Sequence, residues 1–258
     1  MAKHSNIKLN KGLGQHFLTD AEVLRKIVWS IDDNLKEKIP FVEVGPGAGA
    51  LTHYLQNREG YKLIEFDTRW ADHLKEKFPK LKEQIYNVDF LKMELDTIYS
   101  SMAIVGNFPY NISSQILFKV LDYKENVPFV LGMFQKEVAK RICSTPGNKS
   151  YGILSVLIQA FYEAEYLFDV PREAFNPPPK VVSGVLALKR KERLTLPCNE
   201  KFFKQIIKQS FGQRRKTLRN SLKSLIPNDK IKELEVFNLR PEALSVDAFI
   251  NIANMLDV

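Results

Sequence analysis

The spacing of apolar positions switches repeatedly between a helical period and short β-rich runs over residues 20–190. Asp20 is placed to cap a helix whose apolar positions follow at helical spacing: Val23, Leu24, Ile27, Val28 and Ile31. Two further helices are predicted over Arg69–Phe78 and Ser113–Leu121.

β-rich runs lie between these helical segments. Five of them are spaced as in a mostly parallel sheet: Phe41–Val44, Lys62–Phe66, Ile85–Val88, Met102–Val105 and Phe129–Phe134. The last two, Phe161–Val170 and Val181–Leu188, predict a closing hairpin. We therefore expect a Rossmann-like α/β sheet of seven strands with an antiparallel end.

The pattern changes after Lys191, where no β-rich run remains. Three helices are predicted there, over Glu200–Phe211, Arg214–Leu225 and Val246–Leu256, and prolines separate them. We place a domain boundary near residue 190. Residues 1–190 form the larger domain, in which we expect the basic segment 1–19 to be mobile without a ligand, and residues 191–258 form a small all-α domain.

The positive charge of the chain is unevenly placed. The formal net charge is +8, yet the window from Lys189 to Lys223 alone has twelve Lys and Arg against two acids, Glu192 and Glu200. A second basic stretch, residues 1–19, contains no acidic residue. A single charge run is usually a solvated face, but two separated basic regions in a chain of pI near 9.3 favour a polyanionic partner.

Several other classes of protein are disfavoured. The apolar stretches are too short for a membrane span, and the first ten residues are polar and basic, unlike a signal peptide. Cys143 and Cys198 lie far apart in the sequence, with no second Cys or His at ligand spacing. We therefore expect reduced thiols, a cytoplasmic protein and no metal site.

The segment Phe41–Thr52 has the pattern of a strand, a glycine-rich turn and a helix start. Gly45 and Gly47 permit unusual backbone dihedrals and let the backbone approach a ligand closely. Glu65 stands where a dinucleotide fold places a ribose-binding acid. This motif alone does not separate nicotinamide binding from S-adenosylmethionine binding, or from a tight turn without a ligand.

Residues at the ends of two later strands bear on which ligand the glycine loop binds. Asp89 follows the third strand, where its carboxylate could accept a hydrogen bond from the adenine amine of a cofactor, although such an Asp is also a common loop or cap residue. The fourth strand ends in Asn107-Phe108-Pro109-Tyr110. Ligands of open α/β sheets bind at the carboxyl ends of the strands, which is where this tetrapeptide falls.

The tetrapeptide suits methyl transfer to an adenine amine, whose lone pair is delocalised into the ring. The Asn107 side-chain oxygen and the Pro109 carbonyl would accept the two N–H groups and aim the lone pair at the methyl, and Tyr110 would stack the extruded base. Positioning and electrostatics would then carry most of the rate. The competing interpretation is an Asn-Pro turn that caps the following helix, with Ser113 as part of the cap.

Together these motifs resemble the ribosomal RNA adenine dimethyltransferase family, and within it the small-subunit enzymes. Five ordered segments carry the resemblance: Leu13–Leu18, Glu43–Gly47, Val105–Ser113, Phe175–Val181 and Phe211–Leu218. The resemblance covers nearly the whole chain. It implies a class I methyltransferase sheet with a basic, helical RNA-binding domain, an S-adenosylmethionine cofactor and a monomeric enzyme.

The resemblance also implies which residues contact the cofactor: His16, Leu18, Gly45, Gly47, Glu65, Asp89 and Asn107. Glu65 would hold the ribose hydroxyls and Asp89 the adenine amine. Members of the family commonly have Asn where this chain has His16, and Leu where it has Phe108. A backbone contact at position 16 would survive the first change, whereas a side-chain contact would be in doubt.

The substrate that the resemblance implies is a pair of adjacent adenosines in the 3′-terminal hairpin of small-subunit rRNA, each dimethylated within a nearly assembled subunit. Phe175 would be a second aromatic wall beside the target base, or else a core aromatic. The RNA-binding residues would lie on one predicted helix, from which Arg214, Arg215, Lys216 and Arg219 would reach the RNA backbone.

Three alternatives stay open at this point. A large-subunit rRNA adenine methyltransferase shares the same catalytic motif, although the two late segments favour the small-subunit enzyme. A subunit-assembly factor would bind the immature subunit without needing turnover. A nicotinamide oxidoreductase would use the same glycine loop.

Overall fold

The computed structural model describes residues 7, 15–35, 39–226 and 233–257, so most of the segment 1–19 that we expect to be mobile lies outside the described residues. The chain divides into two compact units. The first comprises Met1–Ala139 and Glu165–Lys189, and the second comprises Lys140–Ala164 and Arg190–Val258. The last boundary between the two units, after Lys189, falls near residue 190, where we placed the domain boundary. The grouping of Lys140–Ala164 with the C-terminal helices differs from our prediction.

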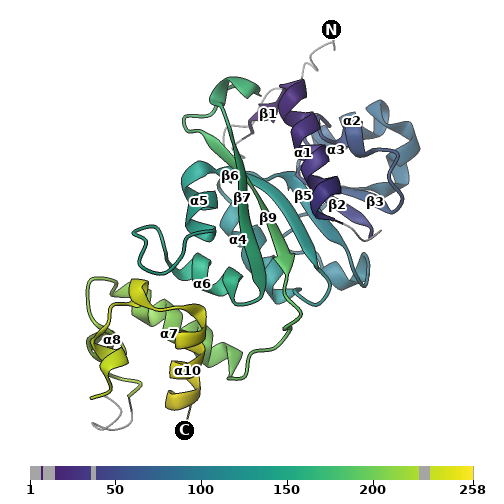
Figure 1. Ribbon diagram of the computed structural model, residues 1–258. Coiled ribbons are helices and arrows are strands. Elements are labelled where there is room, and N and C mark those ends of the chain that lie inside the picture. The colour runs from purple at the N-terminus through teal and green to yellow at the C-terminus, as the bar shows by residue number, and fades with distance from the viewer. Residues whose placement is uncertain (1–6, 8–14, 36–38, 227–232, 258) are drawn as a thin grey trace. The chain divides into compact units, whose positions relative to one another are not determined.

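A seven-stranded sheet with the order β4-β3-β2-β5-β6-β9-β7 organises the fold (Figure 1). Its strands are β2 (Phe41–Val44), β3 (Tyr61–Ile64), β4 (Ile85–Tyr86), β5 (Ala103–Asn107), β6 (Phe129–Gln135), β7 (Tyr162–Val170) and β9 (Ser183–Arg190). Strands β2 to β6 pair in parallel, and β9 is antiparallel to β6. The predicted sheet, with its antiparallel end, is thereby confirmed.

The helices alternate with the strands as the apolar periodicity predicts. They are α1 (Ala21–Asn34), α2 (Thr52–Leu55), α3 (Thr68–Lys77), α4 (Ser113–Asp122), α5 (Lys136–Ile142), α6 (Ile153–Gln159), α7 (Glu200–Gly212), α8 (Leu218–Ser221) and α10 (Val246–Leu256). Asp20 caps α1 as expected, since its carboxylate accepts hydrogen bonds from the N–H groups of Glu22 and Val23.

One hydrophobic core lies between the sheet and the first helices. Leu24, Ile27 and Ile31 of α1 pack into it with residues of α2, α3 and the strands. The alternate strand positions, such as Val42 and Ile104, are also fully buried. Burial of both sets shows that the sheet is covered on both faces, as is usual for parallel strands.

A separate two-stranded sheet joins β1 (Phe17–Leu18) to β8 (Phe175–Asn176) in antiparallel register. Thr19 extends the connection, because its N–H donates to the Ala174 carbonyl at 2.8 Å. The N-terminal motif and the proline-rich motif that carry the family resemblance are therefore neighbours in space. Both lie in the first unit.

The predicted helix over Arg214–Leu225 is wrong. Residues 213–216 form a turn, and α8 covers only Leu218–Ser221. Thr217 is extended at the start of α8, and the Leu218 N–H donates to the Leu239 carbonyl instead of continuing a helix from Arg214. Tertiary pairing has overridden the local helical pattern, so the four basic residues do not share one helix face.

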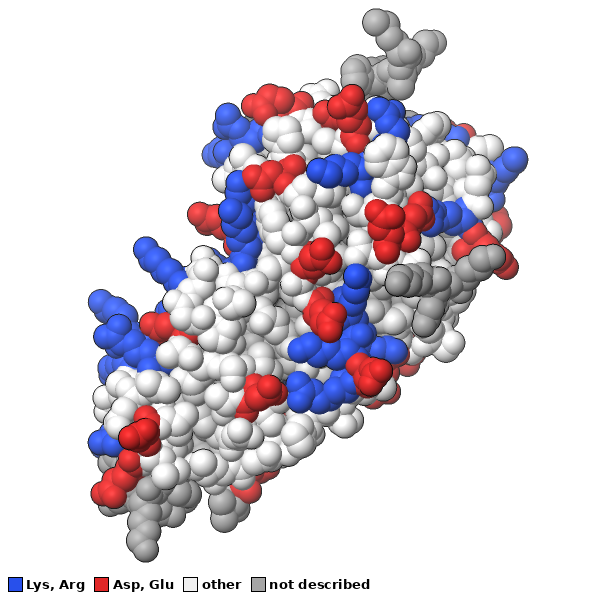
Figure 2. Space-filling model, viewed as in Figure 1, with Lys and Arg blue, Asp and Glu red and all other residues white. Residues whose placement is uncertain are grey.

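Basic side chains gather over the end of β9 and the segment that follows it (Figure 2). The sequence places Lys189, Arg190, Lys191 and Arg193 there. Among the described residues, no helix combines the length and the apolar character needed to cross a membrane. The same residues contain no cluster of three or more His, Cys, Asp and Glu side chains able to hold a metal ion.

Candidate active site

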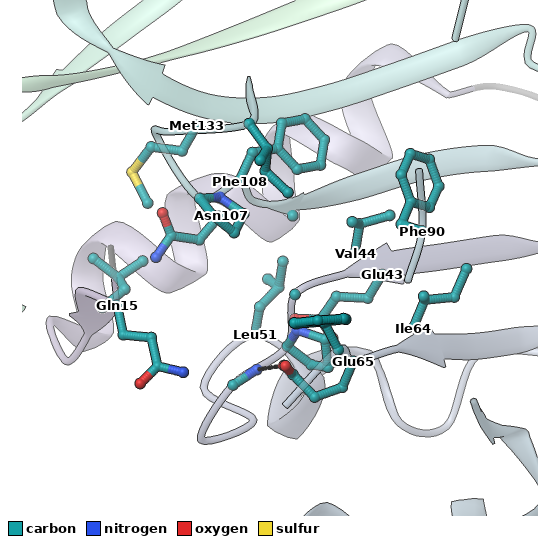
Figure 3. A pocket seen from close by; sticks show the side chains of 18 of the residues that line it. Gln15, Glu43, Val44, Leu51, Ile64, Glu65, Phe90, Asn107, Phe108 and Met133 are labelled. Carbon is teal, nitrogen blue, oxygen red and sulfur yellow. Dashed lines mark hydrogen bonds between the residues drawn. The ribbon is translucent and has the colours of Figure 1, made fainter. Parts of the chain in front are cut away.

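The carboxyl ends of four parallel strands meet at a single pocket of the first unit. Glu65 follows β3, Asp89 follows β4 and Asn107 ends β5, while the glycine loop follows β2; all of them line the pocket. Figure 3 shows Glu65 at one end of the pocket, near Ile64, and Asn107 at the other. The structure therefore brings together the glycine loop and three polar residues, although Gly45 and Asn107 lie 62 positions apart in the sequence.

The glycine loop is shaped by a residue of the N-terminal motif. Gly47 has φ +52°, and a Cβ atom there would lie 2.5 Å from a ring carbon of Phe17. Phe17 also packs against Trp70, with ring centroids 4.7 Å apart. Only glycine permits both the dihedral angle and the close approach, so the loop and the N-terminal motif fit together as one wall of the pocket.

Glu65 is held in place by backbone donors. One carboxylate oxygen accepts the Gly47 N–H and the other accepts the Asp67 N–H, both at 2.9 Å. Burial raises the pKa of Glu65, and these two backbone hydrogen bonds oppose that effect. Each oxygen keeps a lone pair, so the carboxylate can still accept hydrogen bonds from a ligand's hydroxyl groups.

A second buried carboxylate, Glu43, was not predicted to matter. It sits in β2, lines the pocket and accepts hydrogen bonds from the hydroxyl groups of Thr52, at 2.7 Å, and Tyr61. Burial raises the pKa of Glu43 to about 7. The signal was available, because a charged residue inside the fully buried strand Phe41–Val44 requires partners.

Asp89 both caps a turn and lines the pocket, so the two roles that the sequence left as alternatives do not exclude each other. Its Oδ1 accepts the Leu91 N–H at 2.9 Å, so the carboxylate does cap the turn that follows β4. The side chain is nevertheless 28% exposed and lines the pocket. A turn-capping Asp can therefore still offer its second oxygen, Oδ2, to a ligand.

Asn107 is oriented by the backbone of the N-terminal motif. Its Nδ2 donates to the His16 carbonyl at 2.9 Å. Since the NH₂ group of an amide donates and its oxygen accepts, this bond leaves Oδ1 as the acceptor that Asn107 offers to the pocket. Figure 3 shows the Asn107 side chain projecting into the space between Met133 and Gln15.

The rest of the tetrapeptide also lines the pocket and is anchored by packing and hydrogen bonds. The Phe108 ring is fully buried against Phe134, and a Cβ atom on Gly132 would overlap it. Gly132 therefore explains how this chain accommodates Phe at position 108. The Pro109 carbonyl accepts the Ile112 N–H at 3.1 Å, which leaves one lone pair on that oxygen.

Tyr110 makes contacts at both its edge and its face. Its hydroxyl group is hydrogen-bonded to the Ser183 hydroxyl, and its ring stacks on the His16 ring with centroids 5.8 Å apart and an angle of 28° between the planes. Burial raises the pKa of Tyr110. The Ser113 hydroxyl donates to the Tyr110 carbonyl at 3.1 Å, so the predicted cap exists alongside the pocket.

The structure corrects or sharpens three of the predicted roles. The His16 side chain donates from Nδ1 to the Pro177 carbonyl at 2.9 Å, which ties it to the proline-rich motif. Leu18 is buried and lines the pocket. Phe175 is 4% exposed, belongs to the hydrophobic core and is not among the residues that line the pocket. It is the core aromatic of our second interpretation, and the aromatic neighbour of Tyr110 is His16.

The predicted RNA-binding residues separate into two pairs. Arg215 and Lys216 are exposed. Arg214 lies 3.8 Å from the Glu242 carboxylate, and the Nε of Arg219 is buried with no hydrogen-bond partner among the described residues. The first pair is accessible to a partner, whereas the second pair is partly engaged within its own unit.

The sheet order and the polar pocket at the strand ends define a Rossmann-like class I methyltransferase. A family model for ribosomal RNA adenine dimethylase matches residues 6–257, and the chain belongs to that family of enzymes. It is 50% identical over 255 residues to Ribosomal RNA small subunit methyltransferase A of Cytophaga hutchinsonii, covering 97% of this chain and 98% of the relative. The corresponding protein of Flavobacterium johnsoniae is 49% identical over 254 residues, with 97% of each chain covered.

Solved structures share the fold. A dimethyladenosine transferase from Plasmodium falciparum superposes with a TM-score of 0.79 at 24% identity, covering 94% of this chain and 98% of its own. The 23S rRNA methyltransferase ErmE superposes with a TM-score of 0.69 at 25% identity, covering 92% of this chain and 99% of its own. Because a protein named for 23S rRNA shares the architecture, the fold does not identify which rRNA is the substrate.

Proposed function

We propose that this enzyme uses S-adenosylmethionine to dimethylate the N6 amines of two adjacent adenosines in the 3′-terminal hairpin of small-subunit rRNA. The observation that carries the proposal is the orientation of Asn107, whose Nδ2 is bonded to the His16 carbonyl so that Oδ1 is offered as an acceptor. The names of the relatives, which refer to the small subunit, support the choice of rRNA.

The chemistry follows from the acceptors at the end of β5. An adenine N6 amine has two N–H donors, which Asn107 Oδ1 and the remaining lone pair of the Pro109 carbonyl would accept. Accepting both hydrogens draws the nitrogen towards tetrahedral geometry and concentrates its lone pair. The excess proton leaves after the N–C bond has formed, so no strong base is required. Tyr110 stacks the extruded base.

The pocket fits a nucleoside that carries a positive charge better than it fits a dinucleotide diphosphate. The carboxylates of Glu65 and Asp89 line it together with Glu43, which is partly protonated near neutral pH because burial raises its pKa to about 7, and none of the described lining residues is Lys or Arg. The Gly47 N–H, which a phosphate would need, already donates to Glu65. The carboxylates of the pocket repel a diphosphate and attract a cation, which argues against the nicotinamide alternative.

Named residues can hold the nucleoside part of the cofactor. Glu65 would accept from the ribose hydroxyls and Asp89 from the adenine amine, while Gly45 and Gly47 let the backbone approach closely. The His16 and Leu18 segment closes the same pocket. When bound, S-adenosylmethionine supplies an electrophilic methyl group on a positively charged sulfur.

The RNA surface that we propose differs from a single basic helix. Arg215 and Lys216 are exposed in the turn before α8, and Lys201 and Lys208 are exposed on α7. Such side chains can pair with phosphates without regard to sequence, which suits an rRNA duplex read through its backbone. Arg214 and Arg219 would contribute less, because their guanidinium groups are engaged or buried.

The competing substrate is a large-subunit adenine, which stays open because the 23S rRNA methyltransferase ErmE shares the fold. A labelling experiment decides between the two substrates. Each ribosomal subunit from a strain that lacks the modification is incubated with the purified enzyme and labelled S-adenosylmethionine. We expect label in the small subunit. Label in the large subunit alone would overturn the proposed substrate. We also expect a monomer in the cytoplasm, which sedimentation of the purified enzyme and cell fractionation would test.

A further inference from the structure

We infer that Ser183 is a positioning residue for methyl transfer: its hydroxyl group fixes the ring of Tyr110 on which the target adenine stacks. The inference rests on the proposed function, since it assumes that Tyr110 receives the base. Ser183 is not among the residues that line the pocket. Because Ser183 is also fully buried, we expect it to act on the reaction through a neighbour, and its hydroxyl group contacts that of Tyr110.

Ser183 is held by the seven-stranded sheet of the first unit. It is the first residue of β9, pairs with Gln135 of β6 and is fully buried. The preceding residue, Val182, accepts the Lys136 N–H at 3.0 Å, so the sheet pairing continues past the strand end. A hydroxyl group in this setting has a fixed position.

Tyr110, in contrast, lies in the turn between β5 and α4, outside any regular element. A turn residue has more freedom than a strand residue, yet base stacking requires the ring at a defined place. The hydrogen bond between the two hydroxyl groups joins the far end of the Tyr110 ring to the sheet. The hydrogen bond therefore fixes the position of a loop side chain before the substrate binds. Without it, part of the binding energy would be needed to order the ring.

The ring has a second restraint on one of its faces. The His16 ring stacks on it, and His16 is itself tied to the Pro177 carbonyl. Tyr110 is thus restrained at its hydroxyl end by Ser183 and on one face of its ring by His16. With both contacts in place, rotation of the side chain about either χ angle would break one of them.

Removing the Ser183 hydroxyl separates positioning from structure. Ser183→Ala leaves the Tyr110 ring in the site but releases its far end. We expect kcat to fall roughly tenfold, because small misplacements of a reacting group are costly. Binding of S-adenosylhomocysteine should not change, since Ser183 does not touch the cofactor pocket.

The experiment is a double-mutant cycle of Ser183→Ala and Tyr110→Phe. kcat and KM are measured for label transfer into the rRNA of both subunits from an unmodified strain, and S-adenosylhomocysteine binding is measured by calorimetry. If Ser183 acts through the Tyr110 hydroxyl, the double variant will be no slower than Tyr110→Phe alone. Ser183→Thr, which keeps the hydroxyl, should retain most of kcat. Ser210→Ala removes another fully buried hydroxyl, on α7, and should keep wild-type kcat.

Several results would overturn the inference: wild-type kcat in Ser183→Ala or in Tyr110→Phe, independent losses that multiply in the double variant, or a loss explained by weaker S-adenosylhomocysteine binding. The proposed function fails separately. Wild-type enzyme that labels only the large subunit contradicts the proposed substrate, while the cycle measured on that subunit still decides the role of Ser183. If Ser183→Ala does not fold, Tyr110→Phe and Ser183→Thr decide it.

Discussion

The side-chain amide of Asn107 donates a hydrogen bond to the backbone carbonyl of His16 at 2.9 Å, across 91 positions of sequence. The bond has a direction, because only the Nδ2 end of the amide can donate to a carbonyl. The N-terminal motif therefore decides which end of Asn107 the pocket receives. Acceptance of an adenine amine depends on that choice.

Asn107→Asp tests the direction of this amide. The carboxylate keeps two acceptor oxygens but cannot donate to the His16 carbonyl, and two acceptors facing each other repel. We expect single-turnover methyl transfer to fall by about 100-fold or more, as for the loss of an oriented polar group in an active site. Asn254→Ala, an exposed change on α10, is the control. Transfer near the wild-type rate in Asn107→Asp would refute the role of the Asn107–His16 bond.

Gly47→Ala tests the fit between the glycine loop and the N-terminal motif. The new Cβ would lie 2.5 Å from the Phe17 ring, and φ at this position is +52°. Gly147→Ala is a matched control, because Gly147 has φ +85° but no atom of a described residue within 4 Å of its Cβ position. Both variants should lose about 1 kcal/mol of stability through backbone strain. Only Gly47→Ala should lose more than this and also bind S-adenosylhomocysteine weakly; equal losses in thermal unfolding and unchanged binding would contradict the fit.

Glu43→Gln tests the buried carboxylate through the pH dependence of stability. Burial raises the pKa of Glu43 from 4.5 to about 7, so the native state holds this proton more tightly than the unfolded state does. The resulting stabilisation is complete below pH 4.5 and is lost as the pH rises through 7. Denaturant unfolding should show the wild type losing roughly 3 kcal/mol relative to Glu43→Gln between these limits. Parallel pH profiles for the two proteins would show that Glu43 does not titrate in this range.

The paired variant Arg215→Ala and Lys216→Ala tests the RNA surface. Binding to the small subunit should weaken, and the slope of log K against log salt should fall by about one unit for each lost phosphate contact. Arg219→Ala should change the slope less, because part of its guanidinium group is buried. Lys80→Ala removes an exposed charge from the first unit and should leave the slope unchanged. Equal slopes for all these variants would exclude Arg215 and Lys216 from the interface.

Much of the fold could be predicted from the sequence, because apolar runs at the parallel strands have few other interpretations. Phe41–Val44 is found as predicted, and the cap at Asp20 follows from local chemistry alone. The segment after Gly212 could not be predicted in this way. Its helical pattern from Arg214 is broken by the pairing of Leu218 with Leu239, a contact that no local rule contains.

The sequence predicted the residues that line the candidate site but not the residues that hold them in position. Glu65, Asp89 and Asn107 stand at strand ends, where the topology of the sheet fixes their positions. Ser183 was hidden as one small polar residue within an apolar strand. Its partner Tyr110 lies 73 positions earlier, so only the folded chain reveals the pair.

The central claim is tested most directly by mapping adenine methylation with mass spectrometry, after the enzyme has reacted with small subunits from a strain that lacks the modification. We predict two adjacent N6,N6-dimethyladenosines in the 3′-terminal hairpin of the small-subunit rRNA, and none after reaction with Asn107→Ala. Unmodified adenines in that hairpin, with methylation found only in large-subunit rRNA, would contradict the account.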